Sequence, residues 1–236
     1  MRTVEEVVAA NELYTAYQAV VDLERKEVFA YEALVRIHAK EFPDPLALIN
    51  AAVEQGYMGK LGRYLRRQAV EGCPSYRLFL NVHPTEFDEH WLVRPDDSTT
   101  THGHEIYFEI TESVPLSHFR HCHSVLAELR NRGAKIAIDD LGAGYSNLKY
   151  IVDLNPEVVK LDRELVANLH KEPRLRVLVS ALVDLCRQLG AKVVGEGIET
   201  ADELNAVIDT GAHYGQGYYL QRPNAQVELF SWKALA

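Results

Sequence analysis

The chain has 236 residues, of which 47% are hydrophobic and 25% are charged, and its formal net charge is −9. This length suits one barrel of strand–helix units, which takes roughly 200 to 250 residues. The negative charge argues against a protein that wraps long nucleic acid, because that function needs a basic surface to displace counterions. No run reaches the roughly 18 apolar residues of a spanning helix, and charges interrupt the N-terminal apolar residues, so neither a membrane segment nor a signal peptide is expected.

Short apolar runs rich in β-branched and aromatic residues predict the strands. In chain order they are Leu13–Leu23, Val28–Ile37, Arg77–Val82, Glu105–Ile110, Lys135–Ile138, Val158–Leu161, Lys192–Val194 and Tyr214–Leu220. Amphipathic patterns predict helices over Pro45–Glu54, Lys60–Glu71, His118–Arg132, Ser146–Val152, Arg163–His170, Arg174–Leu189, Ala201–Ile208 and Gln226–Ala234. The stretch His90–His104 is expected to be a long irregular surface loop.

Only Glu24–Glu27 separates the first two predicted strands, which indicates a hairpin, and from there strand and helix alternate. Alternation of this kind predicts a mostly parallel sheet covered by helices. We expect one α/β domain over residues 1–236, a modified TIM-type (β/α)8 barrel with one antiparallel strand from the N-terminal hairpin. A doubly wound open sheet is the alternative, although no GxGxxG motif follows an early strand.

Ionisable or metal-binding side chains lie at the ends of the predicted strands from the second to the eighth. They are Glu32 and Arg36, Asn81, Glu109, Asp139 and Asp140, Lys160 and Asp162, Glu196, and Gln216. In a parallel barrel these ends converge on one face. Carboxylates packed so closely raise one another's pKa unless cations neutralise them, and oxygen ligands favour hard cations such as Mg²⁺ or Mn²⁺. A helix cap or a surface charge is the alternative for any one of them taken singly.

The adjacent pair Asp139-Asp140 is suited to bridge two metal ions. Two-metal sites recur in phosphodiester hydrolysis, where they clamp the attacking and leaving oxygens. The pattern therefore predicts a metal site.

The sequence Glu32-Ala33-Leu34-Val35-Arg36 resembles the signature of EAL domains, the cyclic di-GMP phosphodiesterases. Further stretches resemble that family's other motifs in the same order, from about Tyr14 to Pro223. They are Tyr17-Gln18, Phe79–Pro84, Glu109–Glu112, Asp139–Ser146, Val159–Asp162, Gly195–Thr200 and Gly215–Tyr218.

The resemblance implies roles for individual residues. Two divalent cations, Mg²⁺ or Mn²⁺, would be held by Glu32, Asn81, Glu109, Asp139, Asp140 and Glu196. The catalytic set would comprise Lys160, Glu196, Glu32 and Gln216. Cyclic di-GMP would contact Gln18, Arg36, Asn81, Asp162, Tyr218 and Pro223. The loop after the fifth strand would be anchored by Glu112, Gly142 and Gly144.

The reaction implied by the resemblance is in-line attack of a metal-bound hydroxide on one phosphodiester, which gives linear pGpG. The alternatives are an inactive cyclic di-GMP receptor and a protein-interaction module, both of which usually show eroded motifs. The resemblance further implies a homodimer, regulatory or sensor domains tethered to the barrel, and a bacterial origin. Three separated cysteines without a CxxC pair are typical of a reducing compartment, so a cytoplasmic location is expected.

Several positions depart from the family's common pattern, and none is a proposed metal ligand. They are Ala19 in place of proline, Val82-His83 in place of leucine-serine, Leu141 in place of phenylalanine, and Asn147 in place of serine. Leu141 is expected to loosen the loop and slow the reaction. His83 either enters the site or caps the next helix.

Overall fold

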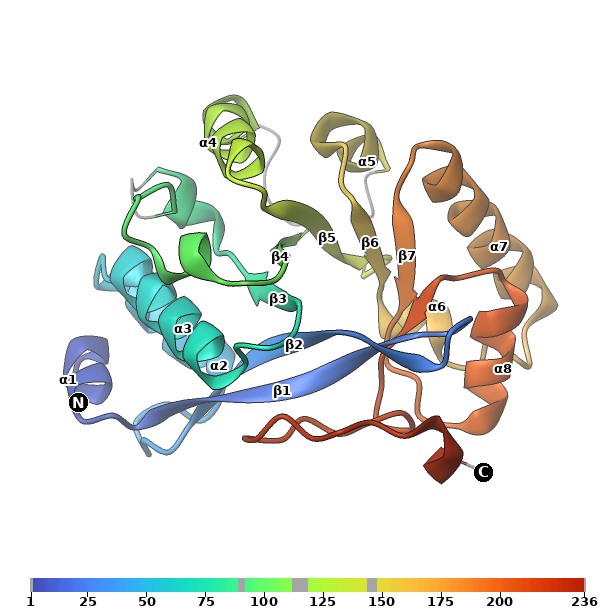
Figure 1. The fold of residues 1–236 in the computed structure, drawn as a ribbon, viewed down its shortest axis with the longest axis horizontal. Coiled ribbons are helices and arrows are strands. Elements are labelled where there is room, and N and C mark those ends of the chain that lie inside the picture. Colours follow the sequence, from blue (N-terminus) through green and yellow to red (C-terminus); the bar gives the residue numbers. More distant parts are fainter. Residues whose placement is uncertain (1, 89–91, 112–118, 144–147, 236) are drawn as a thin grey trace.

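The computed structural model describes residues 2–88, 92–111, 119–143 and 148–235. Its strands close into a barrel in the order of the sequence, and β1 runs antiparallel to both β2 and β8 (Figure 1). The strands are β1 (Leu13–Asp22), β2 (Glu27–Ile37), β3 (Leu78–Asn81), β4 (Ile106–Thr111), β5 (Lys135–Leu141), β6 (Val158–Leu161), β7 (Lys192–Gly195) and β8 (Tyr214–Gly215). The other neighbouring pairs are parallel. The predicted modified (β/α)8 barrel is therefore confirmed, and the open sheet is wrong.

Helices surround the barrel, with α2 and α3 on one side and α7 and α8 on the other (Figure 1). They are α1 (Val4–Ala9), α2 (Pro45–Glu54), α3 (Met58–Gly72), α4 (Phe119–Asn131), α5 (Lys149–Leu154), α6 (Arg163–Val166), α7 (Pro173–Gln188) and α8 (Ala201–Asp209). Short 3-10 turns are η1 (Pro84–Phe87), η2 (Ser98–Thr101) and η4 (Trp232–Leu235). Side-chain caps start several of the helices, because the first turn leaves backbone N–H groups without partners. Asp44 caps α2, and Thr3 and Thr200 form capping boxes at α1 and α8.

The predicted helix over Gln226–Ala234 is wrong, since this stretch is extended and contains only part of η4. The backbone here bonds to the barrel instead of to itself. Tyr17 and Asn224 exchange two backbone hydrogen bonds of 2.7 and 3.0 Å, and the Tyr31 hydroxyl donates to the carbonyl of Glu228 at 2.7 Å. This C-terminal segment lies alongside β1 in Figure 1.

Two other predicted elements are shorter than expected. The strand predicted over Tyr214–Leu220 ends at Gly215, because the chain turns at Gly217, where a Cβ would overlap the backbone of Ile198. The helix predicted over Arg163–His170 ends at Val166, shortly before Asn168, which has a left-handed φ of 59°.

The described part of the stretch from 90 to 104 is more buried than the surface loop that was predicted. Its described part contains η2, and the side chains of Leu92 and Asp97 are buried there.

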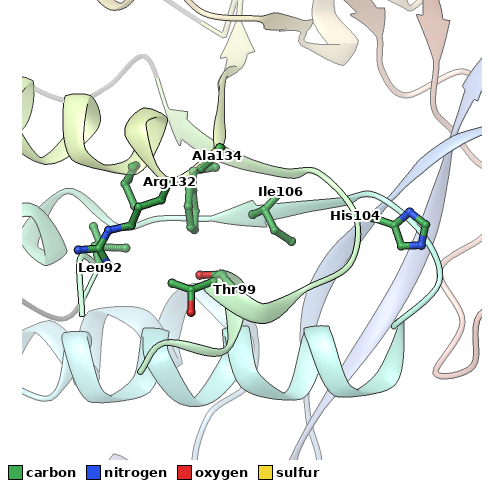
Figure 2. Close-up of a pocket in the computed structure, with 10 residues that line it drawn as sticks. Leu92, Thr99, His104, Ile106, Arg132 and Ala134 are labelled. Carbon is green, nitrogen blue, oxygen red and sulfur yellow. The ribbon is translucent and has the colours of Figure 1, made fainter. Parts of the chain in front are cut away.

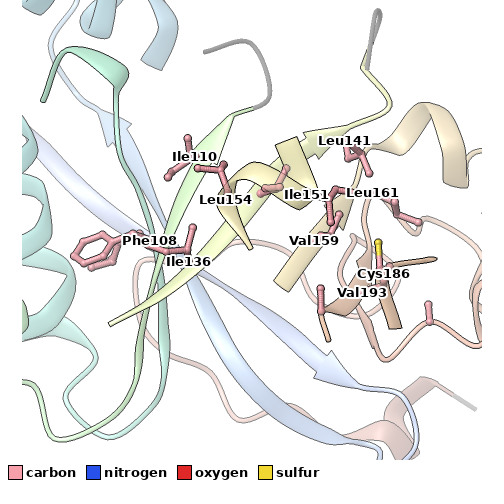
Figure 3. Packing of buried hydrophobic residues seen from close by; sticks show 14 of the residues in the cluster. Phe108, Ile110, Ile136, Leu141, Ile151, Leu154, Val159, Leu161, Cys186 and Val193 are labelled. Atoms are coloured by element: carbon pink, nitrogen blue, oxygen red, sulfur yellow. The ribbon is translucent and has the colours of Figure 1, made fainter. Parts of the chain in front are cut away.

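The main hydrophobic core lies between the outer face of the strands and the surrounding helices. Figure 3 shows strand residues such as Ile136 and Val159 beside helix residues such as Ile151 and Cys186. A separate cluster joins α1, α2 and α3 to the start of β1. The barrel walls are thus packed on the outside, which leaves their inner face for the groups described next.

Candidate functional site

The inner face of the barrel has two layers, which follow from the two-residue period of a strand. The lower layer is a packed cluster of Val20, Ala30, Phe79, Tyr107, Ala137, Val158, Val194 and Tyr214. The polar residues of the upper layer lie two positions away from these along the chain. They come two residues later on β2 to β8 and two residues earlier on the antiparallel β1. They are Gln18, Glu32, Asn81, Glu109, Asp139, Lys160, Glu196 and Gln216. The strands after the first run parallel, so their carboxyl ends bring these side chains to one mouth of the barrel.

Lys160 stands at the centre of this upper layer with 1% of its surface exposed. Its Nζ lies 2.6 Å from Glu109 Oε1, 2.7 Å from Glu196 Oε1, 3.0 Å from Asp139 Oδ1 and 3.3 Å from Glu32 Oε2. Beneath it, Nζ is 5.9 Å from the ring centroid of Phe79. The ammonium therefore lies above the ring of Phe79 and contacts four carboxylates from different parts of the barrel wall.

Two amides complete the ring on either side. Asn81 donates from Nδ2 to Glu109 Oε2 at 3.1 Å and to Glu32 Oε1 at 3.4 Å. Gln216 donates from Nε2 to Glu32 Oε2 at 2.6 Å and to Gln18 Oε1 at 3.2 Å. Glu32 is thus held by β3 and β8 as well as by its own strand.

Gln18 links this ring to the segment after β8. Its Nε2 donates to the carbonyl oxygen of Gln221 at 2.9 Å, and the Gln221 side chain accepts from the backbone N–H of Ala19 at 3.1 Å. A proline at position 19, as the family pattern has, offers no N–H. The departure at Ala19 is therefore matched by an acceptor elsewhere in this chain.

The position of Asp139 and Asp140 depends on an irregularity in β5. The β5–β6 register shifts between Ile138 and Leu141, and Asp140 has a φ of 58°. Bulges of this kind redirect side chains at the rims of barrels. Leu141 then returns to the core with 1% exposure, so its own side chain is tightly packed. Gly142 follows at a φ of 110°, where a Cβ would crowd Leu165.

The pKa values reflect the packing of like charges. Burial, followed by the charge of Glu32, raises the pKa of Glu109 well above its usual range. Burial also raises the pKa of Glu196 well above its usual range, against the opposing effect of Lys160. Burial and Asp139 raise the pKa of Asp140 to about 6. Burial alone would lower the pKa of Lys160, but the surrounding carboxylates outweigh it and raise that pKa well above the usual range.

These residues fit divalent cations. Oxygens of Asp139, Asp140 and Glu196 all lie within 4.8 Å of one another. Among the described residues, the buried atoms Glu109 Oε1 and Asp139 Oδ1 have no hydrogen-bond partner, although both are within ion-pair distance of Lys160. One lysine cannot balance five carboxylates, and an all-oxygen donor set suits Mg²⁺ or Mn²⁺.

Two cavities open at this mouth. One of about 310 Å³ is lined by Gln18, Glu32, Asp139, Asp140, Lys160, Glu196, Gln216 and Tyr218, among others. A larger, mostly apolar one of about 770 Å³ lies between α2, α3 and the ends of β2 and β3, and Asp140 borders both. Their volumes are adequate for a ligand of dinucleotide size.

The structure places the other predicted residues as follows. Arg36 lines the larger cavity and Tyr218 the smaller one, whereas Asp162 and Pro223 line neither. Asp162 instead caps α6 by accepting from the N–H of Glu164 at 2.7 Å. Glu112 and Gly144 lie outside the described residues.

Of the two roles predicted for His83, entry into the site or capping of the next helix, the structure shows mainly the cap. Its Nδ1 accepts from the backbone N–H of Thr85 at 3.3 Å at the start of η1. It also borders the larger cavity.

Arg163 is a rim residue that was not predicted from the sequence. It lines the smaller cavity, forms an ion pair with Glu199 Oε1 at 2.7 Å and donates to the carbonyl of Gly197 at 2.8 Å. Its position directly after Lys160-Leu161-Asp162 was the available signal. A third pocket, near Thr99, Ile106 and Arg132, has only about 60 Å³ and lies on the outer side of β4 (Figure 2).

The fold and the site first define a class, the modified (β/α)8 barrels with an acidic site at the carboxyl ends of the strands. The family model of the EAL domain matches residues 1–223, so the chain belongs to the EAL domain family.

Individual relatives agree with this family. A cyclic di-GMP phosphodiesterase of Pseudomonas aeruginosa (PA2567) is 31% identical over 232 residues, which cover 93% of this chain and 40% of that protein. A probable cyclic di-GMP phosphodiesterase of Escherichia coli (PdeI) is 28% identical, over 94% of this chain and 30% of its own length. The chain thus spans less than half of the length of these relatives.

A solved structure of Klebsiella pneumoniae BlrP1, a complex with manganese and cyclic di-GMP, has the same fold. Its TM-score is 0.80 at 28% identity, over 93% of this chain and 58% of that chain. None of the described helices combines the length and the apolar character needed to cross a membrane.

Proposed function

We propose that this chain hydrolyses cyclic di-GMP to linear pGpG with the help of two divalent cations. The observation that carries the proposal is the ring of four carboxylates and an asparagine around Lys160, with Asp140 next to Asp139 and Glu196, at the mouth where barrel enzymes hold their active sites. Membership of the EAL domain family and the names of its relatives support it.

The cations would be held by Glu32, Asn81, Glu109, Asp139, Asp140 and Glu196, of which Asp139, Asp140 and Glu196 bring oxygens within 4.8 Å of one another. When bound, they would polarise the phosphodiester and acidify a water molecule. The similarity of this chain to the solved BlrP1 complex with manganese and cyclic di-GMP supports this choice of ions.

The reaction needs a new bond between a water oxygen and phosphorus, and it breaks the bond from phosphorus to the ribose 3′ oxygen. The water loses a proton to a carboxylate of the ring, and the protonated carboxyl returns this proton to the departing 3′ oxygen, which leaves as a hydroxyl, so the product carries a 5′ phosphate. Lys160 is an ammonium that forms ion pairs with four carboxylates, and it is therefore suited to hold their charges in place and to face a phosphate oxygen. Gln216 fixes Glu32 through its 2.6 Å hydrogen bond.

The cavities suggest how the ligand would lie. Its phosphates would meet the ring, and one guanine would enter the larger, apolar cavity that begins at Asp140 and contains Arg36. A guanidinium fork suits phosphate geometry, which supports Arg36 as a phosphate contact.

The direct test is to incubate the chain with cyclic di-GMP and Mg²⁺ or Mn²⁺ and to separate the products by chromatography. We expect pGpG. Micromolar binding without turnover would favour an inactive receptor, and neither binding nor turnover would exclude both ligand functions.

The first mutational prediction concerns Glu32→Ala. This change removes a carboxylate that touches both Lys160 and Gln216, and a lost ligand of the metal site should lower turnover by at least about 100-fold. Chromatographic rates measure it, with circular dichroism to verify folding. A variant that keeps the wild-type rate would contradict the metal assignment.

We also propose a homodimer formed through the helices beside β5 and β6. Exposed apolar side chains at and near these helices support it, since Leu148 and Val152 are 43% and 64% exposed at α5, and Val177 is 72% exposed on α7. Light scattering behind a sizing column should give twice the chain mass, and Val152→Glu should give the monomer mass.

A further inference from the structure

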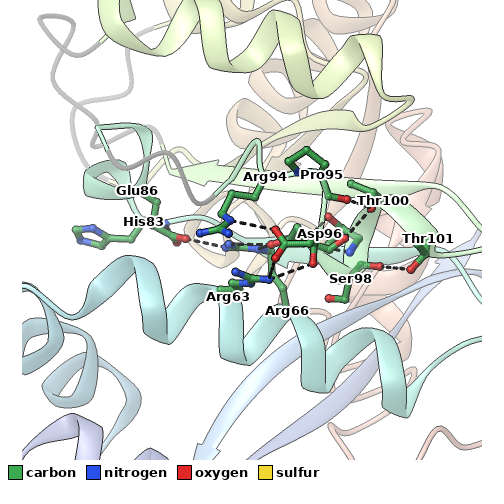
Figure 4. A network of polar contacts seen from close by, with 12 residues as sticks. Arg63, Arg66, His83, Glu86, Arg94, Pro95, Asp96, Ser98, Thr100 and Thr101 are labelled. Atoms are coloured by element: carbon green, nitrogen blue, oxygen red, sulfur yellow. Dashed lines mark hydrogen bonds and ion pairs between the residues drawn. The ribbon is translucent and has the colours of Figure 1, made fainter.

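A group of buried charges lies in the wall of the larger cavity, which Arg66 and Glu86 help to line, and outside the ring around Lys160. Arg66 of α3 is 2% exposed, and its two acidic partners, Glu86 of η1 and Asp97, are 0% and 1% exposed. Arg66 donates from a terminal nitrogen to Glu86 Oε2 at 2.7 Å, and it lies 3.5 Å from Asp97 Oδ2. Figure 4 shows this network between α3 and the loop of η2. Nothing in the proposed chemistry uses it directly.

Glu86 connects α3 to the backbone just after β3. Its Oε2 bonds to Arg66, and its Oε1 accepts from the backbone N–H of His83 at 3.1 Å. The carboxylate also lies directly on Gly62, where a Cβ would overlap it. The helix therefore has no side chain at the place where the carboxylate approaches its backbone.

The segment held by Glu86 is the one that follows Asn81. Asn81 bonds to Glu109 and Glu32, and the N–H of Val82 donates to the carbonyl of Glu109 at 3.0 Å. The chain between Asn81 and Glu86 is thus fixed at one end to the carboxylate ring and at the other end to α3.

The composition of the network favours a positional role over a stabilising one. A buried ion pair rarely stabilises more than apolar side chains of the same size, because both charges lose their hydration. Here one arginine faces two acids, and among the described residues Arg66 Nε has no hydrogen-bond partner. The charged groups instead make contacts that depend on direction. Asp97, for example, also caps η2 by accepting from the backbone N–H of Thr99 at 3.1 Å.

We propose that Glu86 and Arg66 are positioning residues that set the place of Asn81, and through it the affinity of the site for its cations. This inference rests on the proposed function, because it presumes that Asn81 is a metal ligand. The residues act through the backbone of 82–86 and touch neither the ring nor the reacting atoms.

The test compares Arg66→Met and the milder Arg66→Lys with Glu86→Gln, which keeps an acceptor for the His83 N–H. The matched control is Arg63→Met on the same helix, whose guanidinium bonds to Asp96 at the surface at 2.8 Å. Mn²⁺ affinity is measured by calorimetry on nucleotide-free protein, and urea unfolding gives the folded fraction of each variant. Turnover gives KM and kcat separately.

We expect the Mn²⁺ affinity of folded Arg66→Met and Glu86→Gln to fall about tenfold, the lower range for partners of metal ligands. Arg66→Lys should recover part of this loss, and Arg63→Met should match the wild type. If the variants lose stability but bind Mn²⁺ as tightly as the wild type per folded molecule, the network is only structural and the inference is wrong. If the wild type itself binds no Mn²⁺, the proposed function fails instead.

Discussion

A buried lysine needs a physical reason, because burial disfavours its charged form. For Lys160 the reason is the presence of four surrounding carboxylates, which keep its pKa well above the usual range. The same arrangement leaves the ring strongly negative, and burial and mutual repulsion raise the pKa of Glu109. At the scale of single residues, the site is therefore a set of oxygens held ready for additional positive charge.

His213 is a second residue whose charge state matters, and it lies away from the ring. Its Nδ1 accepts from the backbone N–H of Val193 at 3.1 Å, and burial, with Lys192 and Arg187, lowers its pKa to about 4. A histidine with a lowered pKa must stay neutral in the folded protein. Its contribution to stability is therefore complete above the unfolded pKa of about 6.5 and is lost as the pH falls from there toward 4.

We accordingly expect the free energy of unfolding of the wild type to fall by up to about 3 kcal/mol more than that of His213→Gln between pH 7 and pH 4. Urea titrations of both proteins across this range measure the difference, and the glutamine keeps an acceptor for the Val193 N–H. Two curves that fall in parallel would show that His213 does not carry the effect.

At the scale of elements, the chain after β8 does more than cover β1. It includes Gln221, whose carbonyl accepts from Gln18 and whose side chain accepts from the N–H of Ala19, a residue with 0% exposure. Gln18 in turn bonds to Gln216 in the ring. The segment is thus one end of a hydrogen-bonded chain that reaches Glu32.

Gln221→Leu should lower the free energy of unfolding by about 1 to 2 kcal/mol, because it leaves the buried N–H of Ala19 without an acceptor. In the background of Ala19→Pro, which has no N–H at this position, the same substitution should have much less effect. Chemical denaturation of the four proteins of this cycle measures the coupling. Equal losses in both backgrounds would contradict the assignment of this hydrogen bond.

At the scale of the whole molecule, the carboxylate ring is assembled only when the barrel closes, because its members come from β2, β4, β5 and the residue directly after β7. A cation that binds there binds the folded chain alone and stabilises it by mass action. Mn²⁺ at about 100 times its dissociation constant should raise the midpoint of thermal unfolding by about 5 to 10 °C.

Differential scanning calorimetry with and without Mn²⁺ measures this shift, and EDTA should reverse it. In Asp139→Asn, which removes a carboxylate of the proposed metal site, most of the shift should disappear. A wild type that melts at the same temperature with and without Mn²⁺ would argue against a metal site.

Several features of this protein could be predicted from local patterns in its sequence. The two-residue period that places Phe79 and Asn81, or Tyr107 and Glu109, on one face is a property of each strand, so the polar residues that end the strands could be predicted from the sequence. The order of strands and the initial hairpin followed from the same patterns, which is why the barrel could be predicted.

By itself, then, the sequence determined the barrel, its antiparallel first strand and the polar residues that end its strands. Only the tertiary structure decided that residues 226–231 lie extended and that Arg66 pairs with Glu86 and Asp97. These outcomes depend on partners that are far away in the chain and override local propensity, as when the side chain of Gln221 bonds to a backbone group 202 positions earlier. No local pattern encodes such a pairing, because its free energy exists only once the barrel has closed.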